Sequence, residues 1–420
     1  MDTVVRRVLP DLSQEIIRLN KWLITVGLSS MPFEQIVEQL AERLNAAGLR
    51  LARFHVSTST LHPMVRAYGF TWDGHNGLVA AASFAHSDIP GDGWRKSPFA
   101  YMLSNNKDRL RRHLTGPQAQ LDFPVLEEFR DQGLTDWYSA AFSYGMGADL
   151  DELGTIGLIC SASTDRPDGF TDADITMLDQ VLPVMALAFK GTATFQISHT
   201  LLTTYLGADP AQRVLRGAVQ RGSVQSLEAV LFYADLRGFT QLADSTPIAD
   251  LVSMLDDYLE CMAGPVERRG GEVLKFLGDG LLATFGLGDK RRSDVCRTAL
   301  DAGAEALESV VALNEARAAA GKPTMKLDLA LHLGEVMYGN VGTNQRLDFT
   351  VVGPAVNEAA RIEALCKELG RNLLISQNFQ AAATQCRHRL ISVGRHQLRG
   401  VRDTTELFTI GDAVSMPIQN

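Results

Sequence analysis

The chain has 420 residues, of which 45% are hydrophobic and 21% are charged, and its formal net charge at pH 7 is -9. One hydrophobic core does not normally serve a chain of this length, so we expect an ordinary folded protein with two sizeable cores. The acidic balance excludes broad binding to nucleic acid or to an anionic membrane, because both need a concentrated cationic surface.

Cysteine usage and the apolar stretches predict the compartment. The five cysteines lie without CxxC spacing, which indicates neither a zinc site nor a disulfide framework. The first residues lack the apolar segment of a signal peptide. The most apolar stretch, Val181 to Phe189, is far shorter than the roughly 20 residues that span a bilayer. We therefore expect a cytoplasmic protein without a membrane span.

Residues 1–190 predict one domain that begins with two helices. Apolar side chains recur every three to four residues within residues 11–50, as on the buried side of a helix. Residues 51–160 then change to short β-rich runs separated by turn clusters such as Trp72 to Gly77. In order and length these elements resemble a GAF-type sensor domain, an α/β fold, although PAS-like and other α+β sensors share this order. The resemblance implies a regulatory domain with a small-molecule ligand, which the sequence does not identify.

A helix capped by Thr171 or Asp172 closes this domain, and its apolar stripe has two interpretations. The stripe consists of Ile175, Leu178, Leu182, Met185 and Phe189. It is typical of a parallel coiled coil between two subunits, and equally of a helix that packs against its own sheet. Pro183 lacks an amide donor and the pattern falters at Gly191, so both interpretations stay open. The Gly- and Arg-containing residues 191–225 predict a linker or transducer.

Residues 226–420 predict a second domain, with an α+β fold. The expected order is strand 228–233, helix 247–268, hairpin 272–285, helix 293–320, strands 326–333 and 348–352, and helix 355–369. This alternation, with a hairpin inside it, predicts a sandwich with a mostly antiparallel sheet.

Two carboxylates of this domain stand where strands end. Asp235 follows the apolar run from Leu231 to Ala234 and precedes a glycine-containing turn. Asp279 lies in the turn of the next hairpin, between two glycines that let backbone approach a ligand. If the two strands are neighbours, the carboxylates converge. Such a pair suits a hard cation that is bound jointly by protein and phosphates.

The segments around Asp235 and Asp279 resemble the metal-binding signature of class III adenylyl and guanylyl cyclases. The resemblance covers roughly residues 226–410 and implies a ferredoxin-like βαββαβ core. It also implies that the two aspartates, with the backbone carbonyl of Leu236, hold two Mg²⁺ ions per site, for which Mn²⁺ can substitute. In such a site one ion helps to ionise the ribose 3′-hydroxyl, and both steady the triphosphate.

Residues near the C-terminus complete the resemblance. Asn357 and Arg361 lie in a segment that resembles the family's transition-state helix, and their spacing of four places them on one helical face. The resemblance implies that Asn357 positions the ribose and that Arg361 stabilises charge on the reacting phosphate. Arg399 stands where the family usually has a lysine for the terminal phosphates, and Thr240, just after the first carboxylate, is a further expected substrate contact.

Base choice depends on hydrogen-bond donors and acceptors. Lys275 can only donate, which suits N1 of adenine, and the Thr350 hydroxyl can accept from the adenine amino group. ATP is therefore favoured over GTP. A threonine at this position resembles the subclass that responds to bicarbonate, so bicarbonate stimulation is a further hypothesis.

Family sites form between two cyclase domains, and this chain carries one, which implies a head-to-tail homodimer. The sequence therefore predicts an adenylate cyclase that makes 3′,5′-cyclic AMP and pyrophosphate and is regulated by its N-terminal domain. Two alternatives remain. Gly270 to Leu274 faintly resembles the turn of a diguanylate cyclase, and a catalytically silent cyclase-like regulator would have the same fold.

Overall fold

The computed structural model describes residues 12–29, 31–86, 91–145, 157–244, 246–400 and 404–411. The chain divides into two compact units, Met1–Leu201 and Leu202–Asn420, each with its own sheet and core. The division falls inside the segment 191–225 that the sequence predicts as a linker.

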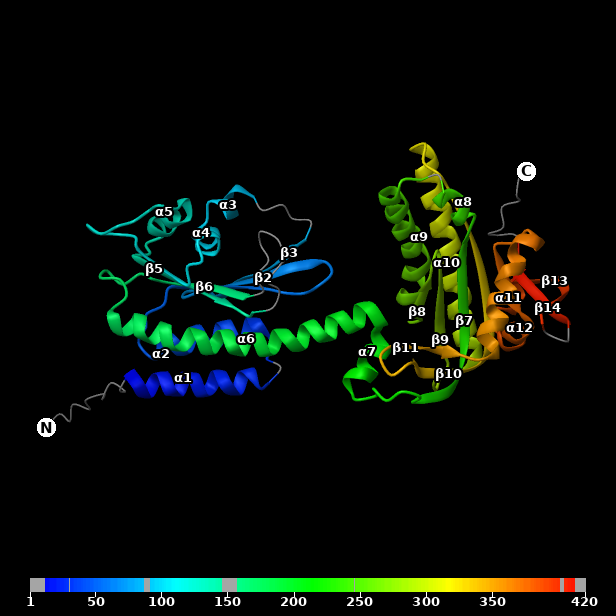
Figure 1. Ribbon diagram of the computed structural model, residues 1–420, viewed down its shortest axis with the longest axis horizontal. Helices are drawn as coiled ribbons and strands as arrows, with labels where there is room; N and C mark the ends of the chain where they lie inside the picture. The colour runs from blue at the N-terminus through cyan, green and yellow to red at the C-terminus, as the bar shows by residue number, and fades with distance from the viewer. Residues whose placement is uncertain are drawn as a thin grey trace. The chain divides into compact units, whose positions relative to one another are not determined.

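The N-terminal unit is built on a six-stranded antiparallel sheet in the order β3-β2-β1-β6-β5-β4. The strands are β1 (Arg53–Ser59), β2 (Val65–Asp73), β3 (Gly77–Ala85), β4 (Arg109–His113), β5 (Asp136–Ser143) and β6 (Gly157–Thr164). Helices α1 (Leu12–Gly27), α2 (Phe33–Ala46) and α6 (Asp172–Leu206) lie along one face, and the short helices α3 (Asp92–Arg95), α4 (Pro98–Ser104) and α5 (Pro124–Asp131) lie on the other (Figure 1). The two expected N-terminal helices are confirmed, and the resemblance to a GAF domain stays a prediction.

Helix α6 settles the two interpretations of its apolar stripe. Its start is capped reciprocally, because the Thr171 N–H donates to Asp174 Oδ2 at 2.8 Å and the Asp174 N–H donates to Thr171 Oγ1 at 3.2 Å. The stripe residues Leu178, Leu182, Met185 and Phe189 are at most 1% exposed and belong to the core beneath the unit's own sheet. The stripe is therefore an internal packing face and not a coiled-coil contact between subunits.

The same helix is longer than the sequence suggests. It passes Pro183 and Gly191 without a break and has 35 residues. Length and composition alone would let it cross a membrane, but half of its apolar window is buried inside the structure. Its apolar character therefore has a ready explanation in the packing of the N-terminal unit.

The C-terminal unit has an eight-stranded sheet in the order β13-β14-β12-β10-β7-β9-β8, with β11 pairing with β10. Its strands are β7 (Val224–Arg237), β8 (Glu272–Leu277), β9 (Gly280–Gly286), β10 (Lys326–Gly342), β11 (Leu347–Val352), β12 (Leu373–Ser376), β13 (Leu390–Gln397) and β14 (Thr404–Ile410). Its helices are α7 (Ala208–Leu215), α8 (Phe239–Ala243), α9 (Ile248–Arg268), α10 (Arg292–Ala319), α11 (Pro354–Leu369) and α12 (Gln377–Ala382). The sequence β7-α9-β8-β9-α10-β10 gives the antiparallel order β10-β7-β9-β8, so the expected ferredoxin-like core is confirmed.

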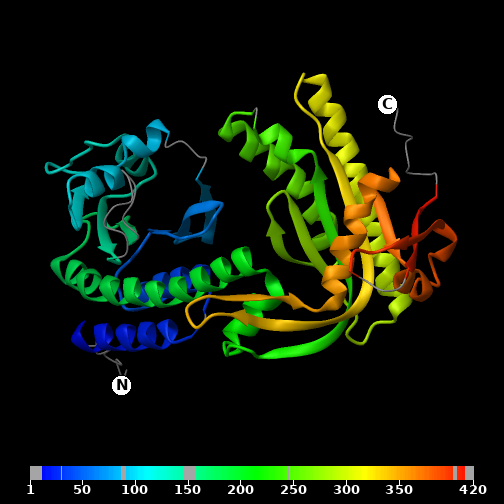
Figure 2. The same ribbon diagram turned by 45° about the vertical axis from the view of Figure 1, so that its right-hand side comes forward.

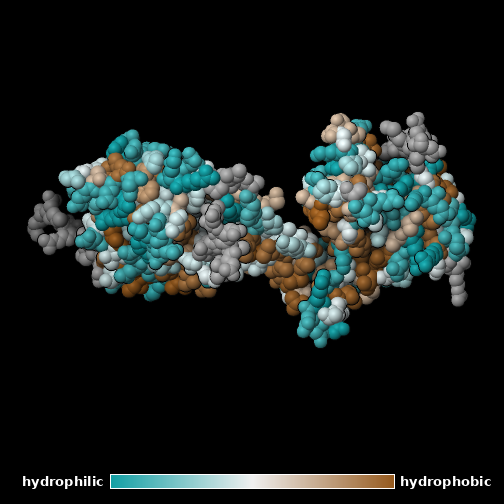
Figure 3. Space-filling model, turned by 45° about the horizontal axis from the view of Figure 1, so that its top comes forward, coloured by the Kyte–Doolittle hydropathy of each residue, from teal (hydrophilic) through white to brown (hydrophobic). Residues whose placement is uncertain are grey.

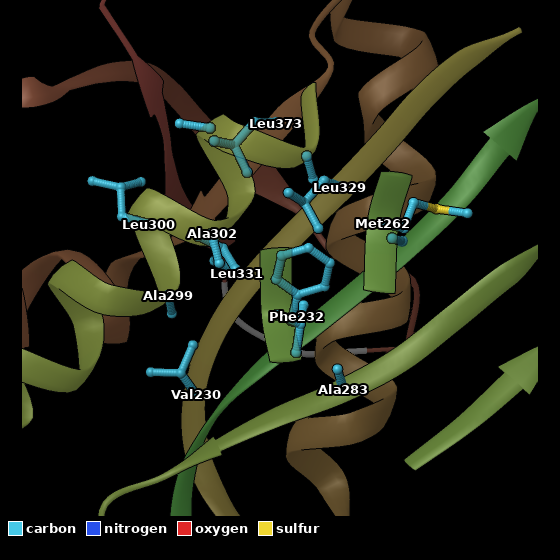
Figure 4. Close-up of a cluster of buried hydrophobic side chains, with 14 of the residues drawn as sticks. Val230, Phe232, Met262, Ala283, Ala299, Leu300, Ala302, Leu329, Leu331 and Leu373 are labelled. Atoms are coloured by element: carbon cyan, nitrogen blue, oxygen red, sulfur yellow. The ribbon is translucent and has the colours of Figure 1, made fainter. Parts of the chain in front are cut away.

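Strand alternation decides which side chains of β7 reach the site. Phe232 and Ala234 point to the face covered by α9 and α10, where they pack among Met262, Ala299 and Leu329 (Figure 4). Their neighbours along the strand point to the opposite face, against which α11 packs. Asp235 therefore lies on the α11 side of the sheet.

The C-terminal unit is larger than the sequence predicts in two places, strand β10 and helix α7. Strand β10 runs nine residues beyond the expected end at Leu333 and forms a long arm with β11 (Figure 2). Helix α7, which the sequence places in the linker, is bound to the sheet. The Asp209 N–H donates to Glu272 Oε1 at 3.0 Å, and the Tyr338 hydroxyl lies within hydrogen-bond distance of Asp209 Oδ2 at 2.8 Å and of Glu272 Oε2 at 3.0 Å. Residues 208–215 are thus part of the C-terminal fold.

Candidate active site

Asp235 and the turn that carries Asp279 lie side by side. Ala234 of β7 pairs with Leu281 of β9, which places Asp235 next to Gly280, the residue after Asp279. A Cβ atom at Gly280 would lie 2.7 Å from Asp235 Oδ1 and would also clash with the Ala234 carbonyl oxygen. Only glycine permits this approach. The pairing of β7 with β9 therefore brings the two carboxylates together, as the sequence predicts.

The two carboxylates are placed where negative charge is unfavourable. Burial, followed by the charges of Asp279 and Asp328, raises the pKa of Asp235 to about 6. Burial also raises the pKa of Asp279. A cation between these groups would relieve both effects, because it offsets the mutual repulsion and replaces the lost solvation.

The donor set fits a cation that is shared with a substrate. Among the residues that the structure describes, no three His, Cys, Asp or Glu side chains are grouped to enclose a metal ion. Two carboxylates leave most positions of a six-coordinate ion for other oxygens, such as those of phosphates, which is the mode that Mg²⁺ prefers. The backbone N–H of Leu236 donates to the Asp235 carboxylate. A role for the Leu236 carbonyl stays a prediction.

Three further charged residues surround Asp235, and the sequence analysis missed them. Asp328 of β10 is the cross-strand partner of Asp235 and is bound by Arg237, whose Nε donates to Asp328 Oδ2 at 2.8 Å. Glu363 of α11 faces the same cluster. Burial, then the charges of Asp235 and Asp328, raise the pKa of Glu363 to about 7. The strand register and the packing of α11 bring these groups together, and no local sequence motif predicts this cluster.

Asn357 and Arg361 occupy one face of α11, as their spacing predicts. The helix buries Ala355, Ala359 and Ile362, whereas Asn357 is exposed and Arg361 is partly exposed. A Cβ atom at Gly400 would lie 3.8 Å from a guanidinium nitrogen of Arg361. The exposed Arg399 precedes this glycine. The structure therefore brings the loop of Arg399 to Arg361.

Arg361 points away from the carboxylates of its own chain. Glu363 is on the side of α11 that faces Asp235. Arg361 precedes Glu363 by two residues, which is a rotation of about 200° around a helix. Arg361 and the Asp235–Asp279 pair of one chain thus face different directions.

Lys275 is held by a residue that the sequence analysis did not name. Its Nζ donates to Asp348 Oδ2 at 2.7 Å, and this hydrogen bond lowers the pKa of Asp348. Asp348 and Thr350 are two residues apart on β11 and therefore share a face of the strand. Lys275 is thus held at the strand face that also carries Thr350, and the reading of a base by these two residues stays a prediction. Thr240 is exposed on α8, directly after β7.

Comparisons with known proteins agree with this geometry. Residues 223–412 match the family model of the adenylate and guanylate cyclase catalytic domain. An adenylate cyclase of Anabaena cylindrica is 31% identical over 164 residues, which are 38% of this chain and 32% of that protein. Adenylate cyclase 1 of Rhizobium meliloti is 31% identical over 163 residues, which are 38% of this chain and 24% of that protein. The chain thus spans no more than a third of the length of either relative.

A solved structure is also similar. The adenylyl cyclase CyaB of P. aeruginosa aligns with a TM-score of 0.41 and 23% sequence identity, over 46% of this chain and 97% of that chain. Residues 223–412 are an adenylate and guanylate cyclase catalytic domain.

Proposed function

We propose that the protein is an adenylate cyclase, which converts ATP to 3′,5′-cyclic AMP and pyrophosphate. The ribose 3′-oxygen attacks the α-phosphorus, the bond to pyrophosphate breaks, and the hydroxyl proton is released. The observation that carries the proposal is the approach of the Asp279 turn to Asp235, which Gly280 makes possible. ATP as substrate is supported by Lys275, which can only donate, and by the names of the two relatives.

Two Mg²⁺ ions per site are the expected cofactor, with Mn²⁺ as a substitute, and Asp235 and Asp279 would hold them with the Leu236 carbonyl. When bound, such ions supply positive charge that lowers the pKa of an attacking hydroxyl and offsets the charge of a triphosphate. The raised pKa of Asp235 supports this role, because a cation would return the carboxylate to its ionised form.

The remaining residues bind and orient the nucleotide. Arg361 offers planar donors to the reacting phosphate, Asn357 holds the ribose, and Arg399 reaches the terminal phosphates. Thr240, exposed beside the end of β7, is a further nucleotide contact. These contacts are more effective when the substrate excludes water from the site.

The working unit in this proposal is a homodimer. Arg361 lies on the side of α11 opposite Glu363, which faces the carboxylates of the same chain. Arg361 of one subunit can therefore serve the carboxylates of the other. A head-to-tail pair would contain two such sites.

Regulation by the N-terminal unit is a further part of the proposal. Helix α7 connects α6 to the start of β8 through the hydrogen bonds of Asp209 with Glu272 and Tyr338. Strand β8 carries Lys275 and leads into the Asp279 turn. A change in α6 is therefore relayed to both groups. Bicarbonate stimulation remains a hypothesis based on Thr350, and an assay at constant pH with and without bicarbonate tests it.

The deciding experiment measures turnover of ATP and, separately, GTP by the full chain with Mg²⁺ or Mn²⁺. Wild type should form cyclic AMP, and Asp279→Ala should not. Asp257→Asn is the matched control, because this aspartate is half-exposed on α9 and lies outside the carboxylate cluster. Cyclic GMP as the main product would overturn the choice of substrate, and the absence of any cyclic nucleotide would overturn the assignment as a cyclase.

A further inference from the structure

The N-terminal unit has a cavity between the hairpin of β1 and β2 and the last turns of α6. Its volume is about 260 Å³, close to the lower end of the range for small-molecule sites. On α6, Phe195 and His199 line the cavity and are one helical turn apart. Gln196 and Thr200 also line it with the same spacing, so one side of the helix faces the hairpin.

The polar side chains of this cavity have few partners within the protein. In the part of the chain that the structure describes, the side chains of five lining residues make no hydrogen bond or ion pair: Thr60, Tyr68, Gln196, His199 and Thr200. Polar groups that converge on a cavity without satisfying one another are available to a ligand.

A second cavity of the same unit differs in this respect. It lies beside the end of α2 and has a volume of about 310 Å³. There Arg50 Nε donates to Asp165 Oδ1 at 3.1 Å, and Asn45 Nδ2 donates to the Leu51 carbonyl at 3.0 Å. These polar groups already have partners, so we assign no ligand to the second cavity.

His62 presents a hydrogen-bond donor to the first cavity. Its Nδ1 accepts from the N–H groups of Met64 and Val65, at 3.0 Å and 3.2 Å. The neutral ring therefore carries its proton on Nε2, which can only donate. Among the described residues, no Asp or Glu lines this cavity. The site thus offers donors without a negative charge.

Arg66 adds a positive charge on the same face of the hairpin. The Thr60 N–H donates to the Arg66 carbonyl at 3.0 Å, so these two residues stand opposite each other. Arg66 is two residues from Tyr68 on β2, and alternate residues of a strand share a face. Arg66 is partly buried, and its guanidinium has no ion pair or hydrogen bond within the described ranges. A guanidinium in this setting favours an anion.

Two aromatic rings give the cavity an apolar side. Tyr68 is partly buried, whereas Phe195 is 53% exposed on α6. Figure 3 shows further apolar surface along the lower edge of the N-terminal unit, the edge at which Figure 1 places α6. An aromatic ring beside polar groups provides contact area for the apolar body of a ligand.

We propose that this cavity binds a small organic acid. Arg66 and His62 hold its carboxylate together with the amide and hydroxyl donors of α6, and its apolar body lies against Phe195 and Tyr68. An inorganic anion would leave the two rings without a contact. An organic cation would face Arg66 and would find no acidic partner among the lining residues.

The site supplies a ligand class for the regulation by the N-terminal unit, and in this respect it rests on the proposed function. A bound acid ties α6 to the hairpin, because α6 contributes four of the seven lining residues. The same helix leads into α7, whose Asp209 is bonded to Glu272 of β8. The ligand therefore acts on the helix from which the proposed relay starts.

Saturation-transfer NMR of the full chain at pH 7 tests the site with benzoate, which combines a carboxylate with a ring. The wild type should transfer saturation to benzoate and not to benzylamine, which has a ring and the opposite charge. Equal transfer to both overturns the proposal. Acetate, which lacks the ring, should bind more weakly than benzoate, and equal affinity for acetate overturns the contact with the two aromatic side chains.

Variants of the lining groups test the location. Arg66→Gln and His199→Ala should each weaken benzoate binding about tenfold, because each removes a donor for the carboxylate. Arg18→Gln is the control for charge, since Arg18 is 62% exposed on α1 and already ion-paired. Ser198→Ala is the control for α6, because its hydroxyl is bonded to a carbonyl of the same helix at 2.8 Å. Equal binding by all four variants overturns the proposal.

Histidine signals locate the contact independently of any loss of binding. In protein with ¹³C-labelled histidine, benzoate should shift the imidazole signals of His62 and His199. The signals of His75, which lines the second cavity, and of His388, in the C-terminal unit, should stay in place. Shifts at His75 instead of His62 and His199 would assign benzoate to the second cavity and overturn the proposal.

The rate of cyclic AMP formation, measured on the same samples, separates this proposal from the proposed function. Benzoate binding at His62 and His199 without any change in this rate retains the site and overturns its role in regulation. Benzoate binding by a chain that forms no cyclic nucleotide retains the site and overturns the cyclase. Cyclic AMP formation without benzoate binding overturns the site and leaves the cyclase in place.

Discussion

Asp136 in the N-terminal unit and Asp235 in the C-terminal unit are both carboxylates that the fold withdraws from water, but only Asp136 has a counter-charge. Asp136 is completely buried and accepts hydrogen bonds from Arg111 Nη2 at 2.7 Å and from the Phe170 N–H at 3.0 Å. Asp235 faces Asp279 and Asp328 instead. A buried acid that is paired within its own fold supports the structure, whereas one that is surrounded by other acids is adapted to a cation from outside.

The sharpest test of this contrast is to remove the Asp235 charge. Asp235→Asn should lower the rate of cyclic AMP formation by about 10³-fold, which is typical for the loss of one group that stabilises a transition state. Its metal-free unfolding temperature should not fall, because the substitution relieves repulsion from Asp279. The measurements are turnover and calorimetry with a chelator. A variant that loses both stability and activity would show that Asp235 supports the fold.

The converse change should damage the N-terminal fold. Asp136→Asn leaves Arg111 without its ionised partner and should lower the free energy of unfolding by about 3 kcal/mol. All four tryptophans lie in this unit, so their fluorescence during urea denaturation reports on it alone. Asp122→Asn is the control, because its pair with Arg112 is more exposed and should cost only about 0.5 kcal/mol. Equal losses would remove the distinction between the two pairs.

The ion pair of Lys275 and Asp348 is intermediate between Asp136 and Asp235. Its carboxylate has a counter-charge, as Asp136 does, but both side chains are about half-exposed. Asp348→Ala releases the ammonium from its position and should lower kcat/KM for ATP about tenfold, as should Lys275→Ala. The double variant should lose little more than either single variant, because both changes remove the same interaction. Steady-state kinetics with ATP and GTP provide the measurement, and fully additive losses would mean that the two residues act separately.

The smallest effect is a pH dependence at Glu363. Its pKa is about 7 in the folded chain against an ordinary value of 4.5, so the folded state holds a proton that the unfolded state releases between these values. The metal-free unit should therefore lose stability as the pH rises from about 4.5 to about 7. The loss should amount to about 1 kcal/mol after allowance for solvent screening. Calorimetry should find a smaller loss in Glu363→Gln, in which only the raised pKa of Asp235 and its neighbours still contributes, and a pH profile equal to that of the wild type would contradict the assignment.

The sequence predicts what is encoded locally. The βαββαβ order and the positions of Asp235 and Asp279 follow from apolar runs that end at acids and glycines. The helix α4 also had a local signal, because Ser97 precedes Pro98 and its Oγ accepts from the Ala100 N–H at 3.1 Å. At seven residues, however, this helix is too short to show a period.

The contacts that could not be predicted from the sequence are those between residues that lie far apart in the chain and meet through strand pairing. Asp328 stands opposite Asp235 because of the register between β7 and β10, and Asp348 reaches Lys275 because β10 and β11 form a long arm. The stripe of α6 was ambiguous for a related reason. Helical periodicity identifies an apolar side but not the surface that covers it, and the sheet of the same unit covers this one.

The lack of space at Gly280 has a consequence for how such domains lose activity during evolution. A single methyl group there would press on the Ala234 carbonyl and on Asp235 Oδ1, although every charged residue of the site would remain. An inventory of acids, amides and guanidinium groups would still count such a domain as competent. The residue at this position is therefore a separate criterion for distinguishing active from inactive members of the family. Gly280→Ala, which adds one carbon atom, reproduces such a loss of activity.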